Sequence, residues 1–381
     1  MASLSGQQRL ASARRIIIKV GSSLLIAPQT SKLRCAWMRH LVTDIADLRA
    51  RGCEVLLVSS GAVAAGRAMM GVAKKPVKLE EAQALAAIGQ LQVASVWAEA
   101  FAEKNQNIGQ VLLTLADTEN RRRWLNCSAT LTNLLQMGVI PLINENDSVA
   151  SDEIRYGDND RLAARAAQMA GADLLVLLSD VDGLYSDDPS KNPDAEHIAL
   201  VRQITPEIQA MAGGASSNLG SGGMTTKLLA AKIASAAGCA TLIADGRENA
   251  PLRALQEQAN CTLFLPAMKP AQARKNWIAG TVAPKGNLTI DAGAAKALLQ
   301  GASLLAAGTI AVDGQFGRGE VVCIQNQQSE ELARGMVSYD AKELQSILGL
   351  KSQQIADRLG YEARKAVVHR DALALSEPIG K

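Results

Sequence analysis

The stretch Met137–Leu162, MGVIPLINENDSVASDEIRYGDNDRL, decides both the fold class and the place of the functional site. Its apolar run, Val139–Ile143, is bounded by polar residues, which is typical of a buried parallel strand. Two clusters of acids and amides follow, Asn144–Asp147 and Gly157–Asp160. Because ligands bind outside the carboxyl ends of strands in open α/β sheets, the stretch predicts a ligand site. A solvated polar loop remains the alternative interpretation.

Similar apolar runs, each followed by a polar or glycine turn, recur on both sides of this stretch. Segments with helical periodicity separate them, and this alternation predicts a three-layer α/β/α domain with a mainly parallel sheet. We place the domain at residues 14–265, after a flexible tail at residues 1–13. The other predicted strands are Arg15–Val20, Glu54–Ser59, Gln110–Thr114, Asp173–Ser179 and Thr241–Ala244.

The composition changes after Pro266. Residues 266–283 contain prolines and a basic cluster, which is typical of a linker. Beyond them, short strands and turns surround a predicted helix at Ala292–Gln300. This pattern predicts a small β-rich domain at residues 284–371, followed by a tail at residues 372–381.

The overall composition argues against several classes of protein. The net charge of +3 over 381 residues and an aromatic content of 3% give no strong nucleic-acid footprint. The 6 cysteines are scattered and the 3 histidines share no ligand spacing, so we expect reduced thiols in a cytoplasmic protein and no metal site built from these residues. No apolar run approaches the roughly 20 residues of a membrane span, and we therefore predict no membrane association.

Two lysines stand beside glycine-rich turns. Lys19 lies inside the first predicted strand, just before Gly21, and Lys227 begins a helix after the glycine-rich loop 213–223. A buried lysine needs an opposite charge, and glycine turns at helix N-termini favour anions. The pattern predicts phosphate binding, although both literal nucleotide fingerprints are absent. An edge-strand lysine and an ordinary first-turn lysine are the structural alternatives.

The predicted site lacks a nucleophile paired with a general base. A carboxylate with a pKa of about 4.3 is already ionised at neutral pH, so it can attack a phosphoryl group without a base. Catalysis then requires only positioning and charge neutralisation. Phosphoryl transfer to a carboxylate therefore suits these residues.

The chain resembles the amino acid kinase family over nearly its whole length after the N-terminal tail. Within that family, Asn144–Asp147 followed by Gly157–Asp160 is similar to the glutamate 5-kinases. The region from Gly286 to about Arg370 looks like a PUA domain, on Asp291–Ala294 and Gly317–Glu320. The wider family resemblance rests on Lys19–Ser23, Ser59–Ala62, Asp182–Tyr185 with Asp188-Pro189, and Gly222–Met224 with Lys227.

The resemblance implies ATP and Mg²⁺ as cofactors and phosphorylation of the γ-carboxylate of L-glutamate, the first step of proline biosynthesis. It implies catalytic roles for Lys19, Asp160 and Lys227. The implied substrate-binding residues are Ser60, Asn144, Asp147, Asp158 and Asn159. The implied ATP-binding residues are Lys19, Ser179, Asp180, Ser221, Gly222, Gly223, Met224, Thr225, Thr226 and Lys227.

The resemblance also implies proline as an inhibitor, a homo-oligomer (dimer or tetramer) and a downstream partner, glutamate-5-semialdehyde dehydrogenase. Two alternatives stay open, another amino acid kinase such as acetylglutamate kinase, and RNA binding through the PUA domain. Asp147 favours glutamate, because a free α-ammonium group needs an anionic partner and an acetylated amine does not.

Overall fold

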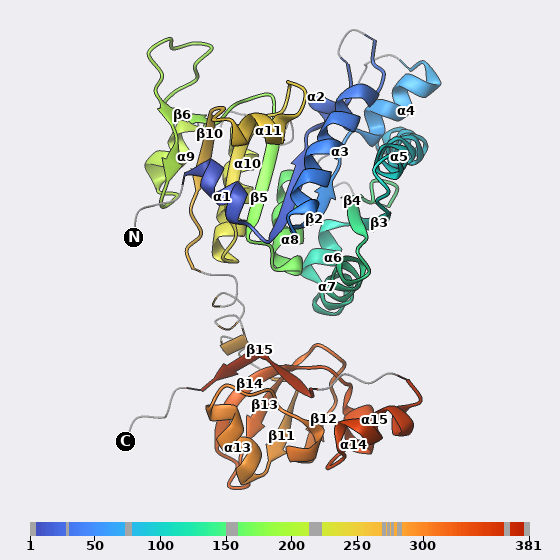
Figure 1. Ribbon diagram of the computed structural model, residues 1–381, viewed down its shortest axis with the longest axis vertical. Coiled ribbons are helices and arrows are strands. Elements are labelled where there is room, and N and C mark those ends of the chain that lie inside the picture. Colours follow the sequence, from blue (N-terminus) through green and yellow to red (C-terminus); the bar gives the residue numbers. More distant parts are fainter. Residues whose placement is uncertain are drawn as a thin grey trace. The chain divides into compact units, whose positions relative to one another are not determined.

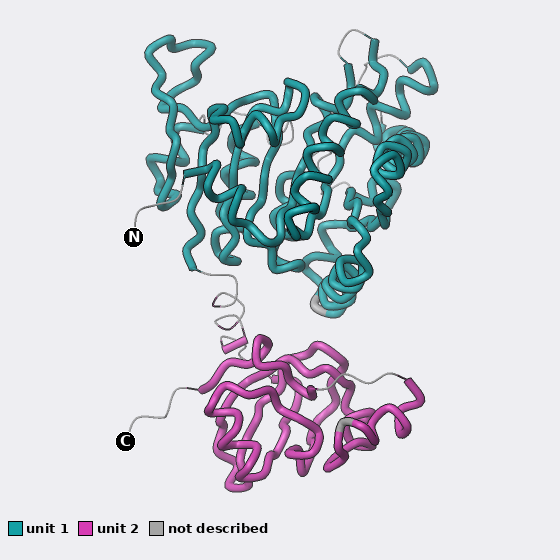
Figure 2. The backbone as a smooth tube through the Cα atoms, in the orientation of Figure 1, with its two compact units in different colours: residues 1–270 teal, residues 271–381 magenta. Residues whose placement is uncertain are grey.

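The computed structural model describes residues 5–27, 30–72, 78–149, 159–212, 223–268, 272, 275, 278–279, 284–361 and 366–376. The chain divides into two units, residues 1–270 and 271–381 (Figure 2). The division falls inside the segment that the sequence predicts to be a linker. No helix in these ranges is both long enough and apolar enough to cross a membrane.

An eight-stranded sheet forms the centre of the first unit, in the order β3-β4-β2-β1-β5-β9-β10-β8. Its neighbours pair in parallel except β9 and β10, so the predicted mainly parallel sheet is confirmed. The central strands are buried on both faces, and this explains their continuous rather than alternating apolar runs. The strands are β1 Arg15–Val20, β2 Glu54–Val58, β3 Ile108–Leu113, β4 Ile140–Glu145, β5 Leu174–Ser179, β8 Leu200–Val201, β9 Ala240–Asp245 and β10 Cys261–Phe264.

Helices cover both faces of this sheet (Figure 1). One core, around Trp37, Trp97 and Leu252, joins the sheet to α1 Gly6–Ser12, α2 Ser22–Leu25, α3 Cys35–Ala50, α5 Leu79–Ala102 and α11 Pro251–Gln256. The other core, around Leu131, Leu162 and Leu228, joins it to α7 Arg121–Gln136, α8 Asn159–Ala170 and α10 Met224–Ala236. The predicted three-layer arrangement is therefore confirmed. The shorter elements are α4 Ala62–Met70, α6 Leu115–Glu119, α9 Pro206–Met211 and the hairpin of β6 Leu184–Tyr185 and β7 His197–Ile198.

The N-terminal segment is not a flexible tail over its described part. Residues 6–12 form α1, and the side chain of its N-cap, Ser5, accepts a hydrogen bond from the Gln8 amide. Leu10 is only 1% exposed, and Arg9 donates to the carbonyl of Asp173 at 3.1 Å. The prediction of a tail was wrong here, because one buried leucine in a polar segment leaves no periodic pattern to detect.

The second unit is built on a five-stranded sheet in the order β12-β11-β13-β14-β15. Its core gathers around Leu288, Ile324 and Tyr339, which confirms a β-rich domain. The predicted end at residue 371 was too early, because β15 continues to Leu375 in pairing with β14. The elements are β11 Gly286–Ile290, α13 Ala292–Leu299, β12 Thr309–Gly314, β13 Val321–Gln325, β14 Glu331–Val337, α14 Ala341–Ser346, α15 Ser352–Leu359 and β15 Val368–Leu375.

Two glycines allow α4 and α5 to pack backbone against backbone. A Cβ atom added to Gly89 would lie 1.9 Å from the carbonyl oxygen of Ala62, and one added to Gly66 would lie 1.9 Å from that of Leu85. Neither backbone atom can move aside as a flexible side chain would. This contact therefore fixes the position of α4, whose first turn follows β2 at the carboxyl edge of the sheet.

We expect Gly89→Ala to lower the free energy of unfolding by about 1–3 kcal/mol, because α4 must move away from α5 to admit the methyl group. Thermal unfolding measures this change. Gly293→Ala in α13 is the matched control, because its Cβ would lie 3.3 Å from Asp291 Oδ1 rather than inside a backbone contact. A melting temperature for Gly89→Ala as high as that of the unchanged chain would contradict the proposed tight packing.

Candidate active site

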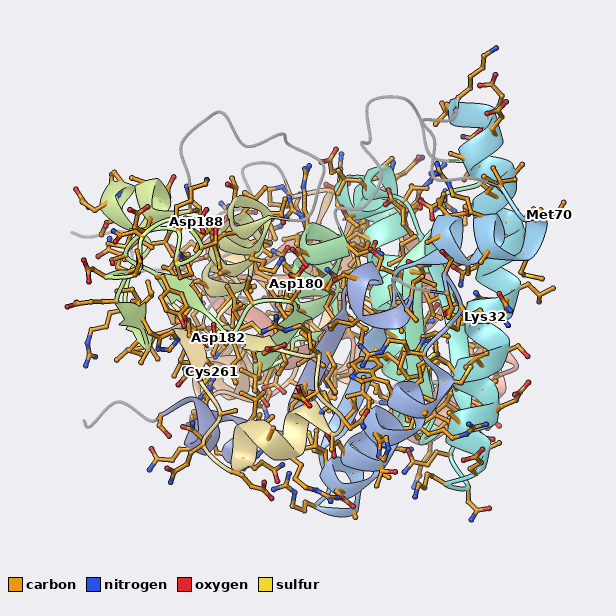
Figure 3. The ribbon with its side chains drawn as sticks, turned by 90° about the horizontal axis from the view of Figure 1, so that it is seen from above. Lys32, Met70, Asp180, Asp182, Asp188 and Cys261 are labelled. Carbon is orange, nitrogen blue, oxygen red and sulfur yellow. The ribbon has the colours of Figure 1, made fainter. Side chains whose placement is uncertain are left out.

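The carboxyl ends of four neighbouring strands, β4, β2, β1 and β5, meet at one edge of the sheet. A cavity of about 600 Å³ opens there. Figure 3 looks onto the molecule from above and shows Asp180 near the middle of the view, with Met70 toward the outer side on α4. The predicted site residues that line the cavity are Lys19, Ser60, Asn144, Asp147, Asn159, Ser179, Asp180 and Lys227.

Asp160 joins the two lysines in one buried cluster. Its Oδ1 lies 2.6 Å from Nζ of Lys19, and its Oδ2 lies 3.4 Å from Nζ of Lys227. The exposed fractions are 1% for Asp160, 6% for Lys19 and 3% for Lys227. The hydroxyl of Thr226 adds a hydrogen bond to Oδ2 at 2.9 Å. We call Lys19, Asp160 and Lys227 the charge triad; its formal charge is +1, which suits an anionic ligand.

The charge of Asp160 is set by two opposing effects. Burial raises the pKa of this carboxyl, but the charges of Lys19 and Lys227 and its hydrogen bonds outweigh burial, so the pKa lies below its ordinary value. Asp160 also stands in the first turn of α8, where the helix dipole favours an acid. The carboxylate therefore remains ionised at neutral pH and holds both ammonium groups in place.

Asn159, the residue before Asp160, connects the ends of two strands, β2 and β4. Its Nδ2 donates to Ser60 Oγ at 2.8 Å, to Asn144 Oδ1 at 3.0 Å and to the carbonyl of Ser59 at 3.1 Å. Its Oδ1 is buried and has no hydrogen-bond partner among the described residues. A buried acceptor of this kind is costly unless a donor reaches it, so a ligand with an N–H or O–H group fits here.

The turn after β2 brings the start of α4 to the cavity. Gly61, the N-cap of α4, has φ +89°, a conformation that side chains other than glycine adopt only with strain. Gly61 and Ala62 both line the cavity. The unpaired amides and the dipole of a helix N-terminus attract anions. The first turn of α4 contains no acidic side chain, so this turn offers a second place where an anion can bind.

Asp147 places an acid in the same cavity, beyond the end of β4. It is half-buried, and burial raises the pKa of its carboxyl to about 6. No lysine or arginine within the described residues pairs with it to offset that burial. A cationic group of a ligand would supply the missing opposite charge.

Ser179 and Asp180 end β5 on the other side of Lys19. The hydroxyl of Ser179 donates to Asp180 Oδ1 at 2.9 Å, and the amide of Gly246 donates to the carbonyl of Ser179 at 2.7 Å. Asp180 and Asp182 lie in the turn between β5 and β6, whereas Asp188 follows β6 (Figure 3). Of these three acids, Asp180 lines the cavity.

The remaining predicted residues divide into two groups. Gly223, Met224, Thr225 and Thr226 stand at the start of α10 and do not line the cavity, although the Thr226 hydroxyl donates to Asp160 of the charge triad. Asp158, Ser221 and Gly222 lie outside the described residues.

Sequence reasoning missed several residues that support or line the site. Trp97 Nε1 donates to Ser59 Oγ at 3.0 Å, and Gln90 accepts a hydrogen bond from the Asn144 amide. Both belong to α5, where helical periodicity indicates a buried face but not what it contacts. Glu145 and Arg67 also line the cavity. Among the described residues, no three histidine, cysteine or acidic side chains form a metal-binding group.

Comparisons with known proteins agree with this geometry. The profile of the amino acid kinase family matches residues 14–245, and that of the PUA domain matches residues 286–359. The glutamate 5-kinase of Brucella anthropi is 53% identical over 368 residues, which is 97% of this chain and 97% of that relative. The glutamate 5-kinase of Rhodopseudomonas palustris is 52% identical over 362 residues, 95% of this chain and 96% of the relative.

A third relative, glutamate 5-kinase 1 of Rhizobium meliloti, is 52% identical over 374 residues, 98% of this chain and 95% of the relative. Such identity extends through both units, beyond the part shared by all amino acid kinases. The chain therefore belongs to the amino acid kinase family and, within it, to the glutamate 5-kinases with a C-terminal PUA domain.

Proposed function

We propose that this chain transfers the γ-phosphoryl group of ATP to the γ-carboxylate of L-glutamate, giving L-glutamyl 5-phosphate and ADP. This is the first step of proline biosynthesis. The observation that carries the proposal is the charge triad. Its two lysines line one cavity together with Asp147 and Asn159, and neither Asp147 nor the Oδ1 atom of Asn159 has a partner among the described residues. Full-length similarity to glutamate 5-kinases supports the same reaction.

The chemistry needs no general base. An oxygen of the ionised γ-carboxylate attacks the γ-phosphorus, and the bond from that phosphorus to the bridging oxygen of ADP breaks. Lys19 and Lys227 neutralise negative charge on the transferring group, while Asp160 keeps their ammonium groups in place. No proton moves in this step, which fits a cavity whose described lining contains neither histidine nor cysteine.

The nucleotide is proposed to bind between the end of β5 and the start of α10. Ser179, Asp180 and residues 221–227 supply this side of the site. Mg²⁺ commonly binds through one or two carboxylates together with substrate phosphates rather than in an all-protein cage. Asp180 lines the cavity and fits that role, and the ion would add charge neutralisation at the phosphates.

Glutamate is proposed to bind on the side of β2 and β4. Asp147 would pair with the α-ammonium group, and the buried oxygen of Asn159 would accept a further N–H. Ser60, Asn144 and Asp158 complete the proposed substrate set. An acetylated amine carries no charge, so it would leave Asp147 without a partner.

The proposal is tested by trapping the acyl phosphate. With ATP, Mg²⁺ and L-glutamate, added hydroxylamine should yield γ-glutamyl hydroxamate. Formation of product from acetylglutamate, with none from L-glutamate, would show that the chain acts on a different acid. The same assay without ATP is the control for uncatalysed hydroxamate formation.

Substrate binding should depend on pH through Asp147. Because its pKa is raised to about 6, the carboxylate is ionised at pH 7 and becomes neutral as the pH falls below 6. The neutral form cannot pair with the ammonium group, so kcat/KM for glutamate should fall about tenfold per pH unit below 6. Asp147→Ala should raise KM with little change in kcat and remove this acid limb. An identical KM in Asp147→Ala would contradict the assigned role.

Four further features are part of the proposal. L-Glutamyl 5-phosphate is labile, so a reductase, glutamate-5-semialdehyde dehydrogenase, should act next. Proline carries an ammonium group and an α-carboxylate, as glutamate does, but lacks the γ-carboxylate; it is proposed to inhibit at the glutamate side. The 6 free cysteines are consistent with the proposed cytoplasmic location. A dimer or tetramer is the proposed assembly.

A further inference from the structure

Arg67 places a third cation in the cavity wall. After its first turn, α4 lines the cavity with Val63, Ala64, Arg67 and Ala68, a spacing that puts them on one face of the helix. Arg67 is the one charged residue of this small, apolar face. The neighbouring residue, Gly66, faces α5 instead, so the close packing of α4 on α5 fixes the direction in which Arg67 leaves the helix.

The charge of Arg67 is not matched by the protein within the described part of the chain. Its Nε atom is buried there without a hydrogen-bond partner, and no acid forms an ion pair with its side chain. The other two cations in the described lining of the cavity, Lys19 and Lys227, share Asp160. A position near the C-terminus of a helix favours a cation, but the helix dipole does not supply the hydrogen-bond acceptor that the buried Nε–H lacks.

The three charges of glutamate can be matched one by one. The charge triad suits the γ-carboxylate and the phosphoryl group, and Asp147 suits the α-ammonium group. Within the described lining of the cavity, Arg67 is then the cation left for the α-carboxylate. We propose that Arg67 binds this α-carboxylate and thereby restricts the enzyme to substrates that carry one. This assignment rests on the proposed function and deepens it.

The reach of the side chain supports the assignment. Arg67 is six residues beyond Gly61, or roughly 9 Å along the axis of α4. Helical side chains lean toward the N-terminus, so the guanidinium group extends back toward the first turn and the substrate. Its planar pair of N–H donors matches a carboxylate in bidentate geometry, which a lysine cannot reproduce.

The test compares two substrates in the full-length chain. 4-Aminobutyrate keeps the γ-carboxylate and the amine of glutamate but lacks the α-carboxylate. Arg67→Met should raise KM for glutamate about 100-fold, while kcat/KM for 4-aminobutyrate changes less than threefold. KM for ATP should not change. Arg39→Met changes an exposed arginine of α3 that pairs with Glu103; it is the matched control and should leave all three constants unchanged.

Three results would overturn the assignment. The first is an unchanged KM for glutamate in Arg67→Met. The second is an equal fall in kcat/KM for glutamate and for 4-aminobutyrate, and the third is a rise in the KM for ATP. If thermal unfolding shows that Arg67→Met does not fold, Arg67→Lys is used to test the assignment instead, because lysine keeps the positive charge but cannot make the bidentate contact. It should raise KM for glutamate about tenfold and leave 4-aminobutyrate unaffected; equal effects on both substrates would overturn the proposal. Absence of glutamate turnover by the unchanged chain would instead refute the proposed function.

Discussion

Replacing Asp160 by asparagine should lower kcat by at least about 10³-fold. Removing one group that stabilises a transition state commonly costs about 10²–10³-fold, and Asp160 positions two such groups. The substitution leaves two ammonium groups in a buried site without a shared anion. Because breaking a buried ion pair typically costs about 3–5 kcal/mol, the variant should also unfold at a lower temperature.

The measurement is the initial rate of ADP release at saturating ATP and glutamate, beside thermal unfolding of the same samples. Glu80→Gln is the matched control, since it also neutralises an acid in the first turn of a helix, α5, but on an exposed face. It should retain full activity. An Asp160→Asn variant that folds and keeps more than a tenth of the original kcat would rule out the positioning role.

The pKa of Asp160 separates its effects from those of Asp147. Since that pKa is below its ordinary value, Asp160 stabilises the fold above about pH 4 and loses this contribution only as the pH falls through its lower folded value. It therefore does not titrate between pH 5 and 8. Asp147, with a pKa of about 6, does titrate in that range. An acid limb near pH 6 should thus disappear in Asp147→Ala.

The strands of the main sheet, and the polar residues at their carboxyl ends, could be predicted from local patterns in the sequence. Buried parallel strands appear as continuous apolar runs, and polar residues near their carboxyl ends point to one edge of the sheet. The sequence placed Lys19, Asn144 and Ser179 at that edge, where all three line the cavity. Lys227 was proposed because it follows a glycine-rich loop near a helix start, and it lines the same cavity. The antiparallel strand β10 was missed, because its four residues are too short to show a pattern.

Contacts between distant residues could not be predicted in the same way. The hydrogen bond from Asn159 to Ser60 joins residues 99 positions apart, and the one from Trp97 to Ser59 joins residues 38 apart. Periodicity identifies a buried face of α5 but not the group that a tryptophan on it will contact. Arg67 gave no signal either, because one arginine among small helical residues is usual on a solvated face. Only the packing of α4 on α5 turns it toward the cavity.

The second large effect is expected for Lys227→Ala, which should lower kcat by about 10²–10³-fold with a smaller loss of stability than Asp160→Asn. Asp160 keeps Lys19 at 2.6 Å after this change, so no charge is left buried alone. The helix dipole also disfavours a cation in the first turn of α10, so removing the Lys227 ammonium group removes an unfavourable interaction with the dipole. The charge triad falls from +1 to neutral, however, and the transferring phosphoryl group loses a cation.

Combining the two substitutions tests whether the triad acts as a unit. If Asp160 works by holding the lysines, the double variant Asp160→Asn/Lys227→Ala should lose about as much kcat as Asp160→Asn alone, because the position of Lys227 no longer matters. Lys232→Ala, on the exposed face of the same helix, is the matched control. Its effect on kcat should simply multiply with that of Asp160→Asn in the corresponding double variant. A double variant whose loss equals the product of the two single losses would mean that Asp160 and Lys227 contribute independently. In that case Asp160 would act on the reaction by a route other than positioning Lys227.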